Sequence, residues 1–375
     1  MKVMSGFRAL LIALVIVLAA YAGGLLTVNP PQDKKTSVPV IKEEIKESES
    51  ASTTPTKDTG HSTSTKETPL SVVKKSSETP TVGETIVLVK KDLPAPPPPP
   101  VDFEKINEYA RDALVNIICV PKSGGLDSVS GSGIIIDKKG VILTNAHIAQ
   151  YFLLSDFLAC IIRTGSPATA RYEAVLLYIP NKWIEENASN IVAENPQGTG
   201  ESDYAFLLIS KALNGGVLPQ EFPFLLLEEA DVQKSNQALV AGYPAGFLGG
   251  LTIFNNLYAI SSVVTIRDVF TFVTDTIDIF SVGGNLLAQK GASGGAIVNK
   301  DSKVVGIVTT ATSEAQTADR DLRAVSSSYI LRNFFEYKNI SLNKFLEKDL
   351  LAEVSLFKEG EFPHLSSLLE NEILK

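Results

Sequence analysis

Short runs of apolar residues alternate with turn signals through most of the chain between residues 102 and 340. Runs of this kind, bounded by Gly, Asn, Asp or Pro, predict β-strands. Many short strands at such spacing favour a barrel or sandwich over a βαβ fold. Two six-stranded antiparallel barrels would fit the length. The expected strands are residues 115–120, 133–137, 141–144, 159–163, 173–179, 204–209, 238–240, 257–264, 270–275, 296–299 and 304–310.

The apolar spacing changes after residue 340 to the period of a helix. We therefore expect a helical tail over residues 341–375 that packs on its own domain, the alternative being a helix for oligomerisation or for a partner protein. The apolar positions are Leu342, Phe345, Leu346, Leu350, Val354 and Phe357, then Leu365, Leu368, Leu369 and Ile373.

An apolar segment opens the chain, because residues 9–28 carry no charged side chain and follow Lys2 and Arg8. At about 1.5 Å per residue, a helix of this length would cross a hydrocarbon core of about 30 Å. We assign residues 1–28 as a signal-anchor transmembrane segment, and the short N-terminal flank favours export of all that follows. The alternative is a signal peptide cleaved after Ala22, which would make the protein secreted.

Residues 29–101 are dominated by Pro, Ser, Thr, Lys and Glu. This composition buries too little surface to offset chain entropy, so we expect a disordered linker. Its length of about 73 residues gives a root-mean-square span on the order of 50 Å. The prolines at 96–100 predict a stiff polyproline II spacer, with an SH3-type ligand as the alternative.

Charge and cysteine content narrow the function classes. The formal net charge is −8 and the pI is near 5.2. Because no Lys/Arg cluster lies between residues 102 and 340, nucleic acid is not an expected partner. Export would place Cys119 and Cys160 in an oxidising compartment, which permits a disulfide, while two small buried side chains are the alternative. The spacing offers no zinc site, and we assign no metal or other cofactor.

Three residues offer the chemistry of a hydrolase. His147 is the one histidine between residues 102 and 340, and Ser293 lies among glycines in Gly291-Ala292-Ser293-Gly294-Gly295. Asp203 opens an apolar strand. Acyl transfer by serine needs a nucleophile, a base and a carboxylate that orients the base, together with backbone N–H groups for the oxyanion. Taken singly, each residue is more often structural, so the hypothesis rests on their joint occurrence. The N–H groups of Gly291 and Ser293 are the candidate oxyanion hole.

Six segments between residues 113 and 330 together resemble the trypsin-like (chymotrypsin-fold) serine peptidases, in the Deg/HtrA-like branch. The resemblance implies two β-barrels, with His147 and Asp203 on the first, Ser293 on the second and the site between them. In that fold the first strand neighbours the strand after the histidine helix, which makes a Cys119–Cys160 bridge reasonable. The matching motifs are GSGIII at 131–136, GVILTNAH at 140–147, DYA at 203–205, AGYPAG at 241–246, GASGG at 291–295 and VVGIV at 304–308.

The chain departs from the family in three respects. Only 45 residues follow residue 330, too few for the PDZ domain that this branch often carries. Ala292 stands where digestive enzymes have Asp and Deg-like enzymes Asn, and no Ile-Val-Gly-Gly segment is present, so activation by zymogen cleavage is not expected. Residues 181–199, with Trp183, form an insertion that we interpret as a surface excursion, with a place at the border of the cleft as the alternative.

The family resemblance says least about the primary pocket, which would bind the substrate side chain next to the cleaved bond. The resemblance implies that Leu287 lies at the base of this pocket and that Thr309, Thr310 and Ala311 lie along its wall. Since none of these side chains is a carboxylate, we expect a preference for small or medium apolar side chains over Lys or Arg.

The sequence thus predicts a membrane-tethered, extracytoplasmic serine endopeptidase that acts on polypeptides through an acyl-enzyme intermediate. The peptidase domain would span residues 102–340, and self-association into a homo-oligomer is left open. Two alternatives remain. One is an α/β-hydrolase, whose order of Ser, acid and His would require His364. The other is a catalytically silent peptidase fold that serves as a binding or stress-sensing module.

Overall fold

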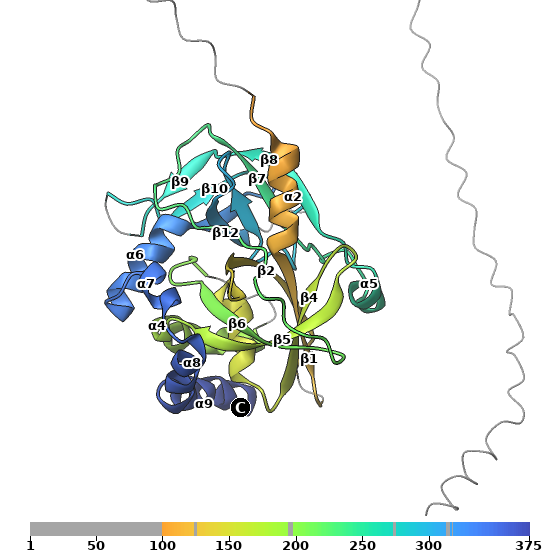
Figure 1. Ribbon diagram of the computed structural model, residues 1–375, viewed down its shortest axis with the longest axis vertical. Helices are drawn as coiled ribbons and strands as arrows, with labels where there is room; N and C mark the ends of the chain where they lie inside the picture. The colour runs from red at the N-terminus through yellow and green to blue at the C-terminus, as the bar shows by residue number, and fades with distance from the viewer. Residues whose placement is uncertain (1–99, 124–125, 194–197, 273–274, 313–315, 317) are drawn as a thin grey trace, which may run out of the picture. The chain divides into compact units, whose positions relative to one another are not determined.

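The computed structural model describes residues 100–375 except 124–125, 194–197, 273–274, 313–315 and 317 (Figure 1). The predicted transmembrane segment 1–28 and all of the predicted linker up to residue 99 lie outside these residues. Within the described part of the chain, no helix is both long and apolar enough to span a bilayer.

Six strands close into an antiparallel barrel in the order β1-β2-β3-β6-β5-β4. All six were predicted, with ends that differ by a few residues. Closure pairs every strand on both sides and leaves no free edge. The barrel interior is apolar, and all four residues of β3 are buried. The strands are β1 (Leu114–Pro121), β2 (Val129–Asp137), β3 (Val141–Thr144), β4 (Leu158–Thr164), β5 (Thr169–Tyr178) and β6 (Ala205–Ala212).

The second half corrects the prediction of another six-stranded barrel: it is a seven-stranded antiparallel sheet in the order β8-β7-β11-β12-β13-β10-β9. Its two outermost strands, β8 and β9, are separated in the chain by only Ile266 and Arg267, so the sheet must curl until its edges approach. Of the predicted strand 270–275, Phe270 is the one described residue that lies in a strand, at the end of the short β9. The strands β10 and β13 were not predicted. The strands are β7 (Gln237–Gly242), β8 (Ile260–Thr265), β9 (Asp268–Phe270), β10 (Ile279–Ser281), β11 (Ala296–Val298), β12 (Val304–Ala311) and β13 (Leu322–Ser326).

A helix that the sequence analysis did not predict, α2 (Phe103–Ala113), leads directly into β1 and lies along β7 (Figure 1). Asp102 caps it by accepting a hydrogen bond from the Lys105 N–H at 3.1 Å. Its buried face consists of Ile106, Ala110 and Ala113, at the spacing of one helical face. The helix therefore packs the start of the first barrel onto the second sheet.

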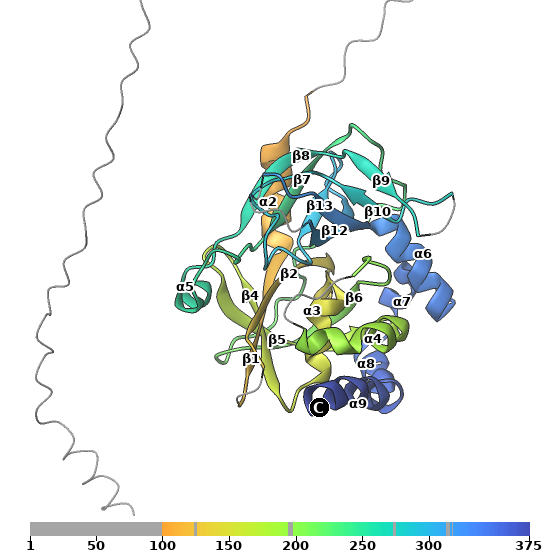
Figure 2. The same cartoon turned by 180° about the vertical axis from the view of Figure 1, so that it is seen from behind.

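The predicted helical tail is present and packs on its own domain beside β5 and α4 (Figure 2). The Ser366 hydroxyl donates to the Leu153 carbonyl at 2.7 Å, and the Phe345 ring meets Phe334 edge to face at 5.2 Å. Most of the apolar stripe is thereby covered within the chain. The helices after the second sheet are α6 (Ser327–Lys338), α7 (Leu342–Glu347), α8 (Leu350–Glu359) and α9 (Phe362–Ile373).

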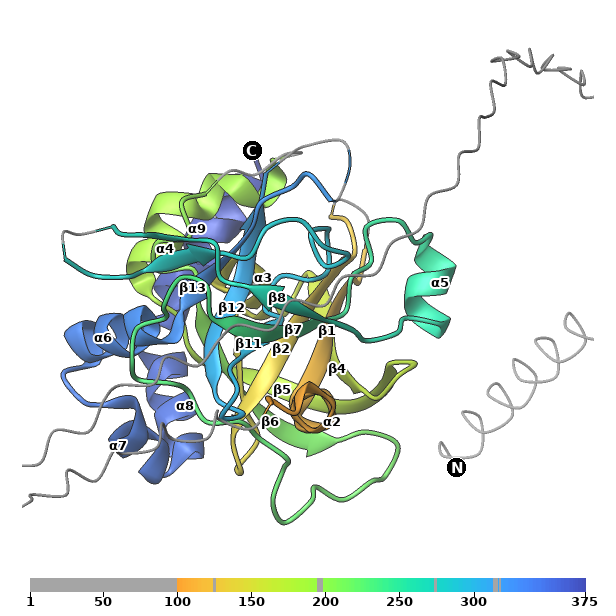
Figure 3. The same ribbon diagram turned by 90° about the horizontal axis from the view of Figure 1, so that it is seen from above.

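Shorter helices occupy the loops, and α5 lies at the periphery of the domain (Figure 3). They are α3 (Ala146–Ala149), the 3₁₀ helix η1 (Gln150–Leu153), α4 (Asn181–Asn187), the 3₁₀ helix η2 (Ala188–Val192) and α5 (Gly250–Asn255).

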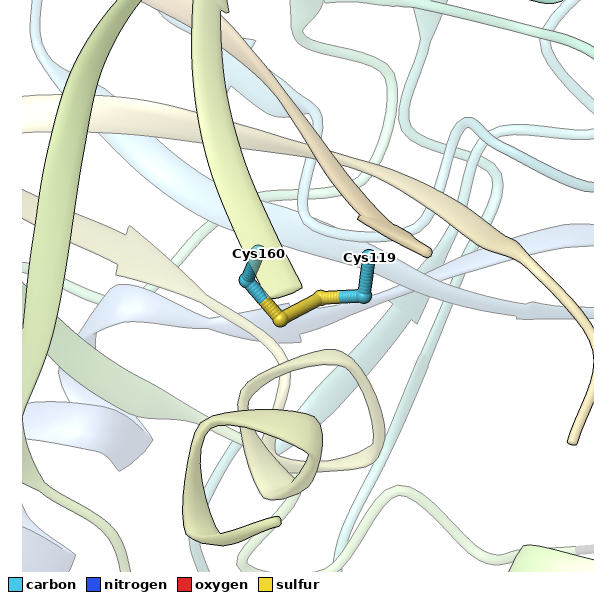
Figure 4. Close-up of a disulfide and its surroundings, with 2 residues drawn as sticks. All are labelled: Cys119 and Cys160. Carbon is cyan, nitrogen blue, oxygen red and sulfur yellow. A yellow bond between two sulfur atoms is a disulfide. The ribbon is translucent and has the colours of Figure 1, made fainter. Parts of the chain in front are cut away.

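Cys119 and Cys160 form a disulfide (Figure 4), which confirms the bridge over the alternative of two free buried side chains. The two residues lie directly opposite each other in the antiparallel pairing of β1 with β4, with their Cα atoms 4.0 Å apart. The bridge thus joins neighbouring strands of the first barrel and closes a loop across the segment that carries His147.

Removing this bridge is expected to lower the free energy of unfolding by about 3 to 4 kcal/mol, because a loop of this length loses less entropy on folding when it is already closed. Denaturant titration of a Cys119→Ala, Cys160→Ala variant measures the loss. Reduction of the wild type should give the same loss and leave the variant unaffected. Equal midpoints for the variant and the oxidised wild type would contradict the prediction.

Candidate active site

His147 and Asp203 are brought together by the pairing of β3 with β6. Thr144, the last residue of β3, lies opposite Ala205, so the segments that flank these strands run side by side. His147 follows on α3 and Asp203 immediately precedes β6. The imidazole Nδ1 lies 2.9 Å from Asp203 Oδ2 and 3.1 Å from Oδ1, and the His147 main-chain N–H donates to Oδ1 at 3.0 Å. The carboxylate therefore fixes both the backbone and the ring of His147.

A third donor to the same carboxylate comes from the second sheet. Thr309 on β12 donates its hydroxyl to Asp203 Oδ2 at 2.5 Å. The family resemblance predicts Thr309 on the wall of the primary pocket, and nothing in the sequence indicates its contact with Asp203. Because the two residues are 106 positions apart, no local motif links them. The Thr309 hydroxyl thus forms a hydrogen bond between the second sheet and Asp203 of the first barrel.

The Asp203 carboxyl is fully buried, and burial by itself raises its pKa. The facing His147 ring, the Thr309 hydroxyl and the His147 N–H act in the opposite direction and prevail, so the pKa is lowered from its usual value. Asp203 is accordingly an anion at neutral pH. An anion at Nδ1 favours the proton on that nitrogen and leaves Nε2 free to accept one.

The Ser293 loop approaches this pair from the second sheet. Its carbonyl accepts from the Ser132 N–H on β2 at 2.7 Å. Gly294, at φ +82°, fits so closely that an added Cβ would collide with the Ser132 carbonyl and with Thr144 Oγ1. Ser293 is therefore held beside the end of β3, the strand that leads into His147. Only glycine combines this backbone conformation with this approach.

The structure does not join Ser293 to His147. Within the described residues, the Ser293 hydroxyl makes no hydrogen bond, and His147 Nε2 has no partner either. Such bonds are often long or absent in ligand-free enzymes and tighten when substrate binds.

Two backbone N–H groups in this loop, those of Gly291 and Ser293, donate to no group among the described residues. The carbonyls between and beside them are all occupied: Lys290 O accepts from Ala245 N, Gly291 O from Ser132 Oγ, and Ala292 O from Gly295 N, each at 2.8 Å. Gly291 adopts φ +92°. Two free donors in one tight turn can bind the oxygen of a developing oxyanion.

The insertion does not behave as the expected surface excursion. Residues 181–192 fold into α4 and η2, and their side chains help to line a cavity of about 770 Å³ beside the His147–Asp203 pair. Trp183 is buried at its edge. Other lining residues are Tyr151, Glu186, Asn190, Glu201 and Thr312. A cavity of this size could hold several side chains of an extended peptide.

The structure says less about the other residues predicted for the site, those of the primary pocket and His364. Leu287 is completely buried and packs in the core of the second sheet. The side chains of Thr310 and Ala311 lie outside the described part of the chain. His364 is exposed on α9, with Nε2 3.9 Å from Glu185 on α4. Both sheets are antiparallel, which argues against the α/β-hydrolase alternative. Among the described residues, no group of three or more His, Cys, Asp or Glu side chains is arranged to hold a metal ion.

Residues 131–307 match the family model described as a trypsin-like peptidase domain. Among solved structures, similarity is found to the crystal structure of Rv3671c from M. tuberculosis H37Rv, determined for a serine-to-alanine mutant in an inactive form. The sequence identity is 16%, the TM-score is 0.39, and the match covers 62% of this chain and 89% of that chain. Likeness at this level supports no conclusion about activity.

Proposed function

We propose that the protein is an active serine endopeptidase with His147, Asp203 and Ser293 as its catalytic triad, a proposal supported by the match of residues 131–307 to the trypsin-like peptidase domain. The observation that carries the proposal is the buried Asp203 carboxylate on His147 Nδ1, with the glycine-bounded Ser293 loop docked on the adjoining strand. The two free N–H groups of the loop supply the oxyanion hole.

In the proposed reaction, Ser293 Oγ attacks the carbonyl carbon of the scissile peptide while His147 Nε2 takes the hydroxyl proton. The carbonyl oxygen becomes an oxyanion facing the N–H groups of Gly291 and Ser293. His147 then gives its proton to the leaving amine, the C–N bond breaks, and an acyl-enzyme remains. A water molecule attacks the acyl group by the same steps and restores the serine. Asp203 stays ionised throughout and stabilises the imidazolium.

We also propose that this domain works outside the cytoplasm, tethered by the apolar segment 1–28 through the linker 29–101. The Cys119–Cys160 bridge supports an oxidising compartment. The alternative is a leader that is cleaved after Ala22, which would give a secreted enzyme. Polypeptides are the expected substrates.

The two described histidines provide a matched test of the proposed function. His147→Ala should abolish hydrolysis of an unfolded polypeptide by the full-length protein, because the base is lost. His364→Ala should keep wild-type activity, since this side chain is exposed, lies 3.9 Å from Glu185 and is not among the residues that line the cavity beside His147. Loss of activity in His364→Ala, or its survival in His147→Ala, would overturn the assignment. A wild type inactive from pH 6 to 9 would favour the silent binding module.

The primary specificity is expected to be for small or medium apolar side chains. No carboxylate occurs among Leu287, Thr309, Thr310 and Ala311, so a Lys or Arg side chain would lose its hydration without gaining a charged partner. Rates for otherwise identical peptide substrates ending in Ala, Val or Arg measure the preference. We expect kcat/KM to be at least about tenfold higher for Ala or Val. Faster cleavage after Arg would contradict it.

A further inference from the structure

Ser132 lies at the junction of the two halves of the domain and is completely buried. On the side of the first barrel, its carbonyl accepts from Thr144 Oγ1 at 2.7 Å. Its other polar groups reach the second half. The N–H donates to Ser293 O at 2.7 Å, and the hydroxyl donates to Gly291 O and accepts from Tyr243 N, each at 2.8 Å. One residue thus holds both ends of the Gly291–Ser293 turn.

The bond to Gly291 O concerns the peptide that lies between the two candidate oxyanion donors. A carbonyl here that turned inward would present negative charge where the oxyanion must bind. Gly291 is at φ +92° and lacks a side chain to restrict its rotation. Within the described residues, no donor other than Ser132 Oγ reaches Gly291 O, and Tyr243 N has no other acceptor. At the other end of the peptide, the Ala292 N–H donates to Gln289 O at the longer distance of 3.3 Å. The Ser132 hydroxyl is therefore the one hydrogen-bond partner that holds the carbonyl end of this peptide among the described residues.

We infer that Ser132 is a positioning residue for oxyanion stabilisation: its hydroxyl keeps the Gly291 carbonyl turned away, so that the N–H groups of Gly291 and Ser293 face the reacting carbonyl before substrate arrives. This inference rests on the proposed peptidase function. Ser132 touches no reacting atom, and its effect is transmitted through the loop.

The expected signature is a loss in the chemical step. Ser132→Ala leaves two buried polar groups, Gly291 O and Tyr243 N, without partners. The Gly291 carbonyl can gain a new donor only if the turn rearranges. Misplacement of this kind by a residue away from the chemistry lowers kcat roughly 10- to 100-fold. KM should change by no more than about twofold, because substrate contacts are retained. Affinity for a peptide boronic acid, whose tetrahedral adduct places an oxygen in the same hole, should fall by the same factor as kcat.

Thr144→Val is the matched control. It removes another buried hydroxyl from the same cluster, the donor to Ser132 O, but leaves Ser132 Oγ on Gly291 O. If the cluster has a purely structural role, the melting temperature and kcat should both fall in both variants. If Ser132 has the positioning role, the melting temperature should fall somewhat in both variants, but kcat and the affinity for the boronic acid should fall only in Ser132→Ala.

The experiment uses the full-length protein with one peptide substrate and the boronic acid of the same sequence. If Ser132→Ala does not fold, Ser132→Cys replaces it, since the thiol has a similar shape and is only a weak donor. An active wild type whose Ser132 variant keeps kcat within twofold would overturn this inference alone, as would an equal loss in Thr144→Val. An inactive wild type would overturn the proposed function and this inference with it.

Discussion

Replacing Ser293 by Ala is expected to lower kcat for peptide hydrolysis by on the order of 10⁵- to 10⁶-fold, because the acyl-enzyme cannot form without the hydroxyl. Folding should be unaffected. The hydroxyl makes no hydrogen bond within the described residues, and the contacts of the loop belong to its backbone. Initial rates together with thermal unfolding separate the two effects.

Ser210→Ala is the matched control for Ser293→Ala. This serine is also half-buried, and its hydroxyl makes a long bond of 3.4 Å to Glu173 O on the far part of the first barrel. We expect wild-type rates. A Ser293→Ala variant that retained more than about 1% of kcat would show that hydrolysis does not depend on this nucleophile.

Replacing Asp203 by Asn is expected to lower kcat by about 10⁴-fold near neutral pH while leaving the fold in place. In the wild type, the Asp203 carboxylate accepts hydrogen bonds from two donors of His147, Nδ1–H and the main-chain N–H. An amide offers a single acceptor oxygen, and its NH₂ facing Nδ1 would move the imidazole proton to Nε2, the nitrogen that must accept from Ser293. Steady-state kinetics from pH 6 to 9 measure the loss.

Thr309→Val tests whether the loss of kcat expected for Asp203→Asn comes from the Asp203 carboxylate itself. It removes one donor to Asp203 but keeps the anion on His147. We expect a loss of no more than about 100-fold, well short of that in Asp203→Asn. A loss of less than about tenfold in Asp203→Asn would mean that His147 does not need its acid partner, against the triad mechanism.

The strands of the first barrel were predictable because their apolar runs end at clear turn signals. The strand 141–144 was predicted with the bounds that the structure has. The second sheet was harder, since β10 has three residues and follows Asp278. An acidic residue next to a short apolar run is typical of a loop. Here Asp278 is buried and bonded to Arg332 Nη2 at 2.6 Å, a partner that no local pattern indicates.

The same limit applies to the candidate site. His147, Asp203 and Ser293 stand out because each lies in a recognisable motif. Thr309 and Ser132 have partners 106 and 159 positions away. Ser132 lies in one of the matching motifs, but nothing local to either residue indicates which group it contacts. The insertion was misinterpreted for a related reason: no local pattern indicates that Trp183 and Ile184 are buried against the domain.

The most direct test of the proposed triad is covalent labelling of the full-length protein with a fluorophosphonate, followed by peptide mapping in a mass spectrometer. We expect the wild type to form a single adduct, on the Ser293 side chain, and the His147→Ala variant to form none. An adduct on any other serine, or none from pH 6 to 9 in a folded wild type, would contradict it.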